Sequence, residues 1–189
     1  TLFVGYALYT VPFAYVIAGL LSRQPSDLWI ARARSWSLVA WVFLSVGIIL
    51  GAWWAYVELG WGGYWAWDPV ENSSLIPWLV GTAALHSAAV QARRGIFRAW
   101  TTALYLLTFI LCIFATFVTR SGVIQSVHAF ERSSIGLYFG LFLIFLLVAG
   151  YGLLIARRRQ LAGDRPLDSF LSREAAFLLV LVVLAAACG

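Results

Sequence analysis

Long apolar runs alternate with short polar segments along this chain, and the pattern predicts an all-α bundle of membrane-spanning helices. Each complete run is long enough to cross the roughly 30 Å hydrocarbon layer of a bilayer as a helix. The runs are continuous and do not alternate residue by residue, which disfavours a transmembrane β-barrel. We expect one transmembrane domain over residues 1–189 with six spans, at about 2–21, 36–57, 75–92, 99–118 and 135–156, and from about 175 onward.

The arginines predict how these spans are oriented. All thirteen basic residues are arginines, against eight acids, for a formal net charge of +5. Eleven of them lie in three alternate polar segments, whereas the two segments between hold only Arg120 and Arg132. By the positive-inside rule, segments 58–78 and 119–134 then face the outside, which is the periplasm in a bacterium. Because the charges flank apolar spans, they indicate a lipid bilayer as the partner and not a nucleic acid.

Composition agrees with this assignment. Hydrophobic residues make up 62% of the 189 residues and charged residues 11%, against about 25% charged in soluble domains. Such a chain is not a soluble enzyme, a disordered segment or a secreted disulfide scaffold. Cys112 and Cys188 lie in apolar runs without a CxxC spacing, so we expect free thiols. The chain lacks Met and both its ends are apolar, from which we expect an internal piece of a longer membrane protein.

Residues 53–78, WWAYVELGWGGYWAWDPVENSSLIPW, hold six of the ten tryptophans. Interfacial belts of membrane proteins also enrich tryptophan. A belt does not need three tryptophans interleaved with glycines that free the backbone, however. Clustered indoles form a flat, partly wet apolar platform that suits a large planar ligand. Asp68, Pro69 and Glu71 predict a helix start with a capping box, and we expect a short helix on the outer face there. Their carboxylates need have no further role.

The two histidines are candidate metal ligands. His86 lies inside a span, about 10 Å of helix rise from Arg93, where an ionisable group is costly. It is either an iron ligand or a donor to another helix. His128 lies in the segment that shares a side with the Trp-rich segment, so a planar iron ligand, haem, fits both features. Arg120 and Arg132 either pair with its propionates or are ordinary flanking charges. Thr108, Cys112 and Thr116 form a polar seam that faces either a cofactor or a neighbouring helix.

WGGYWAWDPVENSSLIPW resembles the tryptophan-rich WWD signature of the haem-handling membrane proteins of cytochrome c maturation. GTAALHS and FVTRSGVIQSVHAF resemble the CcmF/NrfE branch of that superfamily, and the likeness runs from the first residues to about Ser134. The signature often has Trp and Phe where Tyr64 and Ala66 stand here, which reduces the platform.

The resemblance implies two haem b groups, one stable within the membrane and one transient at the WWD segment. His86 matches one of two transmembrane histidines that ligate the stable haem, and His128 matches one of two periplasmic histidines at the WWD segment. In the family, the other histidine of each pair lies outside the segment that this chain covers. The implied haem-binding residues of the two outer segments are Trp61, Gly62, Gly63, Tyr64, Trp65, Trp67, Asp68, Pro69, Glu71, Asn72, Arg120 and Arg132.

The resemblance further implies a cytochrome c haem lyase of the bacterial inner membrane. Such a protein receives haem from the chaperone CcmE and joins its vinyl groups to the CxxCH thiols of apocytochrome c, together with CcmH/CcmI-type components. No residue is assignable as a catalytic acid or base. The alternatives are an NrfE- or CcsA-like haem export or ligation protein, and a membrane b-type cytochrome that passes electrons.

Overall fold

The regular secondary structure of the described part of the chain is all helical. The computed structural model describes residues 1–23, 26–58, 60, 62–122 and 135–161, and four later positions, 179, 180, 183 and 187. Five helical segments within these ranges are long and apolar enough to cross a membrane, which confirms the predicted fold class. The sixth predicted span lies almost wholly outside the described residues. The elements are α1 (Leu2–Leu8), α2 (Thr10–Ser22), α3 (Ser26–Glu58), α4 (Pro69–Arg94), α5 (Arg98–Ser121), α6 (Ile135–Ala156) and a 3₁₀ turn, Arg158–Leu161.

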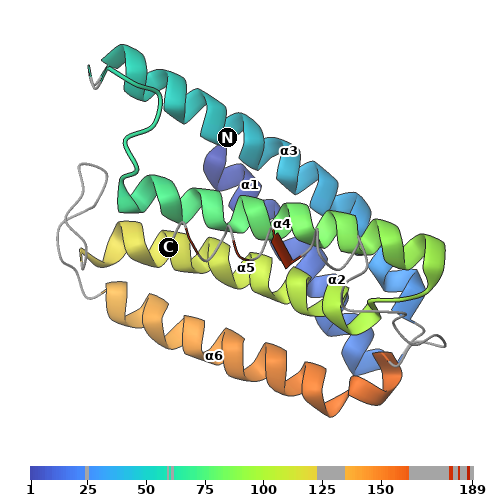
Figure 1. The fold of residues 1–189 in the computed structure, drawn as a ribbon. Helices are drawn as coiled ribbons and strands as arrows, with labels where there is room; N and C mark the ends of the chain where they lie inside the picture. Colours follow the sequence, from blue (N-terminus) through green and yellow to red (C-terminus); the bar gives the residue numbers. More distant parts are fainter. Residues whose placement is uncertain are drawn as a thin grey trace.

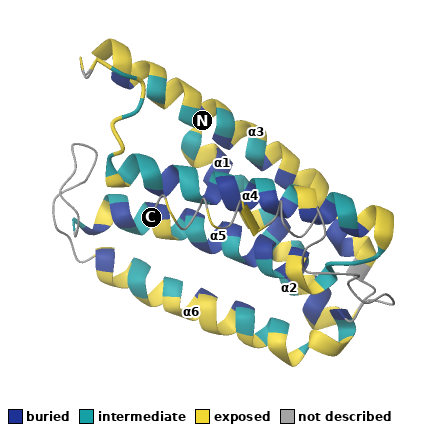
Figure 2. Ribbon diagram, viewed as in Figure 1, coloured by how far each residue is buried: buried dark blue, intermediate teal, exposed yellow. Residues whose placement is uncertain are grey.

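The helices pack in a row, with α3 against α4, α4 against α5 and α5 against α6 (Figure 1). Helices α1 and α2 pack on α3, and α2 also reaches α5. Most of α4 and α5 is buried, whereas α6 and the outward side of α3 are exposed (Figure 2). The exposed side chains there are apolar, as with Leu137 and Val148 of α6. In a bilayer such surfaces contact lipid or further membrane helices.

The first predicted span is divided into two helices at Tyr9, between α1 and α2. Pro12 explains this break, because a proline ring clashes with the carbonyl four residues earlier and provides no amide hydrogen for it. That carbonyl belongs to Leu8, the last residue of α1. The Tyr9 ring points into the core with its hydroxyl against α4, at a distance of 2.4 Å from the point where a Cβ on Gly81 would lie. Gly81 therefore makes room for Tyr9.

Helix α3 begins ten residues before the predicted span and includes Arg32 and Arg34, which were expected in a loop. The reason is a buried stripe at helical spacing that continues past the end of the apolar run. Trp29, Ile30 and Ala33 are each at most 5% exposed, and the stripe goes on through Ser37, Ala40 and Leu44. Packing on this side therefore extends the helix while the arginines remain on its exposed side.

The predicted short helix at Asp68 is wrong, because α4 runs without interruption from Pro69 to Arg94. Pro77 lies inside this helix and is buried. Proline is tolerated within membrane helices because neighbouring groups re-satisfy the backbone that it frees. We name the two ends of the bundle after α4: the Trp end, where it begins at Pro69, and the Arg end, where it finishes at Arg94.

Polar side chains connect three helices at the Arg end. Arg98 donates two hydrogen bonds to the Asp27 carboxylate, from Nε at 3.2 Å and from a terminal nitrogen at 3.0 Å. Gln91 of α4 donates to the same carboxylate. Between α4 and α5, Gly95 takes a left-handed conformation with φ of 71° and its amide caps the Gln91 carbonyl. This turn and the Asp27 contacts fix the alignment of α3, α4 and α5.

Candidate functional site

The Trp-rich segment connects α3 to α4 at the Trp end of the bundle. Gly60 and Gly62 have positive φ angles of 63° and 70°, in open space, so glycine is needed there for the backbone turn and not for close packing. Trp67 also has a positive φ, 56°, which is uncommon for a residue other than glycine. The surrounding hydrogen bonds therefore hold Trp67 in an unusual conformation.

These hydrogen bonds come from the start of α4. The Asp68 carboxylate accepts the Val70 amide at 2.9 Å, and the Glu71 carboxylate accepts the amides of Ala66 at 3.0 Å and Asp68 at 3.3 Å. The Asn72 side chain donates to the Trp67 carbonyl. The predicted capping box is thus confirmed, with Pro69 at the first turn. Asp68, Glu71 and Asn72 shape the segment, and their contact with haem stays a prediction.

Aromatic side chains cover the outside of the segment. Trp67 is 65% exposed, and the Tyr64 ring stacks on the Tyr56 ring with centroids 4.5 Å apart. Trp65 instead faces inward, donates its indole N–H to Asn72, and lines a groove of about 190 Å³ together with Trp54 and Glu71. One part of the segment therefore presents a free aromatic surface, while the other part anchors it to α3.

His86 lies on the exposed side of α4. Its Nδ1 is 2.8 Å from the backbone carbonyl of Thr82, one turn earlier in the same helix. A carbonyl can only accept, so Nδ1 carries the proton in this contact, and in the neutral ring Nε2 holds the lone pair. Metal-ligating histidines commonly use such a hydrogen bond to fix the tautomer and orient the ring. This geometry fits an axial ligand to iron.

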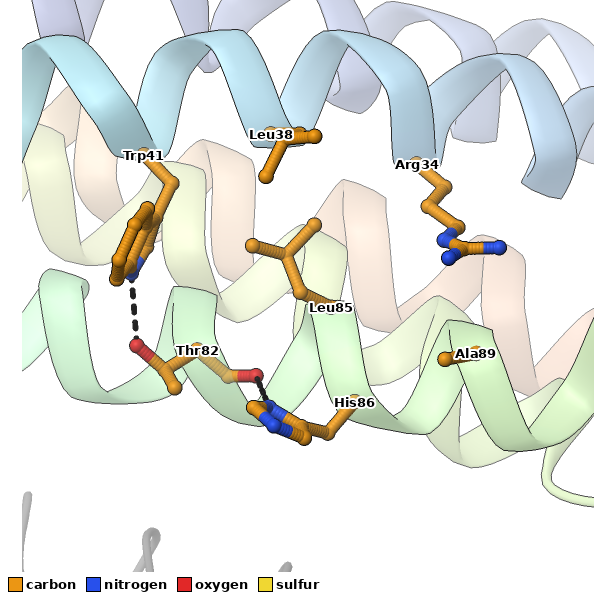
Figure 3. A pocket seen from close by; sticks show the side chains of 7 residues that line it. All are labelled: Arg34, Leu38, Trp41, Thr82, Leu85, His86 and Ala89. Carbon is orange, nitrogen blue, oxygen red and sulfur yellow. Dashed lines mark hydrogen bonds between the residues drawn. The ribbon is translucent and has the colours of Figure 1, made fainter.

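His86 is one of seven residues that line a groove of about 280 Å³ between α3 and α4 (Figure 3). We call it the α3–α4 groove. Its apolar residues are Leu38, Trp41, Leu85 and Ala89, and its polar ones are Arg34, Thr82 and His86. In the ranges that the structure describes, no three His, Cys, Asp or Glu side chains gather as a metal-ion cage. The groove offers one imidazole, that of His86, and a haem iron takes a single histidine of this kind from each side.

Two tryptophans connect the groove to the Trp-rich helix start. The rings of Trp41 and Trp78 stack with centroids 5.6 Å apart. The Trp41 indole donates to the Thr82 hydroxyl at 2.8 Å, and this hydroxyl donates to the Trp78 carbonyl at 2.7 Å. The Trp78 indole donates in turn to the Ser45 hydroxyl, which donates to the Trp41 carbonyl, both at 2.8 Å. This reciprocal network fixes the position of Thr82, the residue whose carbonyl orients His86.

The polar seam on α5 is helix packing. Thr108 donates to the Leu104 carbonyl and Thr116 to the Cys112 carbonyl, each one turn earlier in α5. Thr108 and Cys112 are both buried, and the Thr108 methyl group faces Gly81 of α4. These contacts account for the seam without a cofactor.

Only the beginning of segment 119–134, up to residue 122, belongs to the described residues. Arg120 is exposed in the last turn of α5. Trp61, His128 and Arg132 lie outside the described residues, so the roles expected of them stay predictions. Arg34 and Trp41 were not recognised from the sequence, although the spacing of residues 34, 38, 41 and 45 places them on one side of a helix. That spacing was the available signal.

The model of the cytochrome c assembly protein family matches residues 1–125, about two thirds of the chain. The chain belongs to this family. Members with similar sequences include the cytochrome c-type biogenesis protein CcmF of Haemophilus influenzae, 46% identical over 94% of this chain, and that of Escherichia coli strain K12, 47% identical over 98%. The NrfE protein of Haemophilus influenzae is 43% identical over 97%.

A solved structure of the same family has a similar fold. The protein described as cytochrome c haem lyase CcmF matches 99% of this chain with a TM-score of 0.77 and 37% sequence identity. The chain spans 28% of that protein and 28–29% of these relatives. The resemblance of this chain to the CcmF/NrfE branch is thus confirmed at the level of the family.

Proposed function

We propose that this chain is the haem-binding portion of a cytochrome c haem lyase in a bacterial inner membrane. The observation that carries the proposal is the placement of His86, with Nδ1 held by the Thr82 carbonyl and the ring beside an apolar groove. In a protein related to CcmF at 46–47% identity, this placement supports ligation of a resident haem b by His86. Bound there, the haem would supply one-electron chemistry that keeps the substrate iron reduced.

The second haem b is the substrate, and the Trp-rich segment is proposed as its platform. Exposed Trp67 and Tyr64 offer aromatic surface, while the Asp68–Glu71 capping network holds the segment rigid. His128 would contribute an axial ligand from segment 119–134, and Arg120 and Arg132 would pair with propionates. In this topology segments 58–78 and 119–134 face the periplasm, as the arginine distribution predicts.

The reaction is thioether formation between haem and apocytochrome c. Each thiol of the CxxCH motif adds across one vinyl group of the haem that is delivered by CcmE, with CcmH/CcmI-type components presenting the apocytochrome. The chain contributes orientation, because a platform that holds the haem by one surface and by its propionates leaves the vinyl edge accessible. No acid or base of this chain takes part in the proposed step.

Two variants of the full-length protein test the proposal, and each acts as the control of the other. His86→Ala should lose haem b from the purified protein, whereas His128→Ala should retain it and stop cytochrome c assembly in cells. Haem content is read from the pyridine haemochrome, and assembly from haem-stained c-type cytochromes. Normal cytochrome c assembly in both variants would reject the proposal that the protein is a haem lyase. It would favour a membrane b-type cytochrome, which also needs a haem-ligating histidine inside a span.

A further inference from the structure

Arg34 shares the α3–α4 groove with His86. Its side chain extends from α3 into the space between the helices and faces Ala89 of α4 (Figure 3). The same side chain lines an adjoining groove of about 380 Å³, which continues toward the Arg end between Ile30 and Gln91. The guanidinium therefore lies where these two grooves meet.

No hydrogen bond or ion pair connects Arg34 to any residue that the structure describes. Arg98 differs, because two of its three nitrogens donate to Asp27 and its side chain is only 15% exposed. The Asp27 carboxylate is thus already occupied by Arg98 and Gln91. The planar donor set of Arg34 remains directed into the groove.

Membrane orientation explains why an arginine lies near the Arg end, since positive charge is favoured on the inner side. It does not explain why this arginine faces the groove. Arg32 satisfies the same charge rule two residues earlier, which is about 200° around the helix. Both arginines are exposed, but only Arg34 lines the two grooves. The position of Arg34 thus goes beyond what membrane orientation requires.

We propose that Arg34 binds a propionate of the haem that His86 ligates. The inference rests on the proposed ligation by His86 and names the residue that orients the porphyrin. The carboxylate edge of the porphyrin then faces the Arg end of the groove, and the vinyl edge of the porphyrin faces Trp41 and the Trp end. A guanidinium binds a carboxylate through paired, charge-assisted hydrogen bonds, which are strong where water is scarce.

The spacing of the groove residues is compatible with one bound porphyrin. Ala89, which Arg34 faces, is three residues beyond His86, or about 4.5 Å along α4. Arg34 itself belongs to the neighbouring helix, whose axis lies about 8–10 Å away at a typical packing distance. An iron porphyrin held at His86 carries its carboxylates on short flexible arms at the ring edge. Leu38 and Leu85 lie in the same groove and would contact the apolar part of the ring.

A propionate contact gives two measurable consequences. The first is a preference for haem b over its dimethyl ester, in which both carboxylates are blocked. A hydrogen bond to a charged group makes this preference roughly 10- to 100-fold in affinity. The second is a raised midpoint potential, because a positive charge near the iron disfavours the ferric state. Both consequences differ from those of a residue that only packs against the helix.

The test uses full-length protein in membranes from cells depleted of haem. Wild type, Arg34→Gln, Arg34→Lys and Arg32→Gln are titrated with haem b and with its dimethyl ester, and the midpoint potential of each haem b complex is measured. Wild type and Arg32→Gln should prefer haem b by the same factor. Arg34→Gln should lose most of the preference and shift the potential downward, while Arg34→Lys should retain part of both.

The possible results distinguish failure of the Arg34 contact from failure of haem ligation by His86. Equal affinity of wild type for both porphyrins rejects the contact without requiring any variant to fold. An Arg34→Gln protein with wild-type preference and potential also rejects it, as does an Arg32→Gln protein that loses as much as Arg34→Gln. His86→Ala is measured alongside: haem b retained by this variant would reject ligation by His86 itself. If His86→Ala loses haem b but wild type binds both porphyrins equally, only the contact between Arg34 and the propionate is rejected, and ligation by His86 stands.

Discussion

The contact between Trp41 and Thr82 allows the coupling of α3 to α4 to be measured. Trp41→Phe removes the indole donor and retains an aromatic ring against Trp78. The Thr82 hydroxyl keeps its own acceptor, the Trp78 carbonyl at 2.7 Å. Only one interhelical hydrogen bond, 2.8 Å long, is therefore lost. Its net contribution to the free energy of unfolding should be about 0.6–1.5 kcal/mol. The lower value is the average for hydrogen bonds between membrane helices, and the upper value is the top of the range for proteins in general.

Thr82→Val should lower stability more than Trp41→Phe does. It keeps the side-chain shape but leaves the partly buried Trp41 indole N–H without its acceptor, which costs about 1–3 kcal/mol. In the double variant neither partner of the lost bond remains, so its destabilisation should be smaller than the sum of the two single changes. We expect a coupling energy on the order of 1 kcal/mol.

The assay is unfolding of the full-length protein in detergent, followed by circular dichroism of the helical signal. Trp36→Phe is the matched control, because Trp36 is an exposed tryptophan of the same helix and its replacement should change stability by less than about 0.5 kcal/mol. Additive effects of Trp41→Phe and Thr82→Val, with a coupling below about 0.3 kcal/mol, would refute the proposed role of this hydrogen bond. Both variants should also reduce haem b content, since Thr82 orients His86.

Two further predictions concern the start and the middle of α4. Asp68→Ala should destabilise the protein by about 0.5–2 kcal/mol and increase proteolysis within residues 60–68, whereas Asp68→Asn should remain near wild type because asparagine also caps helices; equal cleavage of all three proteins would contradict the capping role. Gly81→Ala should cost about 1–3 kcal/mol in thermal unfolding, because its Cβ would lie 2.4 Å from the buried Tyr9 hydroxyl. Gly152→Ala, in open space, should be neutral or stabilising, and a Gly81→Ala protein as stable as that control would show that Tyr9 does not pack against Gly81.

Local and lipid-imposed features were predictable from the sequence. A bilayer requires every backbone group of a span to be bonded within a helix, so apolar length predicts where the spans lie, and the bounds expected for α6 agree with the structure. The capping box was predictable because Asp68 and Glu71 act within one helical turn. The Trp-rich segment was singled out by composition, and two of its three glycines, Gly60 and Gly62, do take positive φ angles.

Features that depend on packing between helices were not predictable in this way. The apolar pattern ended at Arg34, but the buried stripe from Trp29 to Leu44 continued the helix beneath the arginines. Pro77 did not end α4, because tertiary contacts outweigh its local penalty in a membrane helix. The α3–α4 groove requires the alignment that places Trp41 opposite Thr82, and no pattern within either helix specifies this alignment.

The most direct test of haem ligation in the α3–α4 groove is replacement of the His86 imidazole by free imidazole. Full-length His86→Gly protein is purified, and its haem b spectrum is recorded with and without added imidazole. We predict that the variant lacks the low-spin haem b of wild type and that imidazole restores it, because the groove remains and only the ligand is missing. An unchanged low-spin haem b spectrum in His86→Gly without imidazole would contradict ligation by His86.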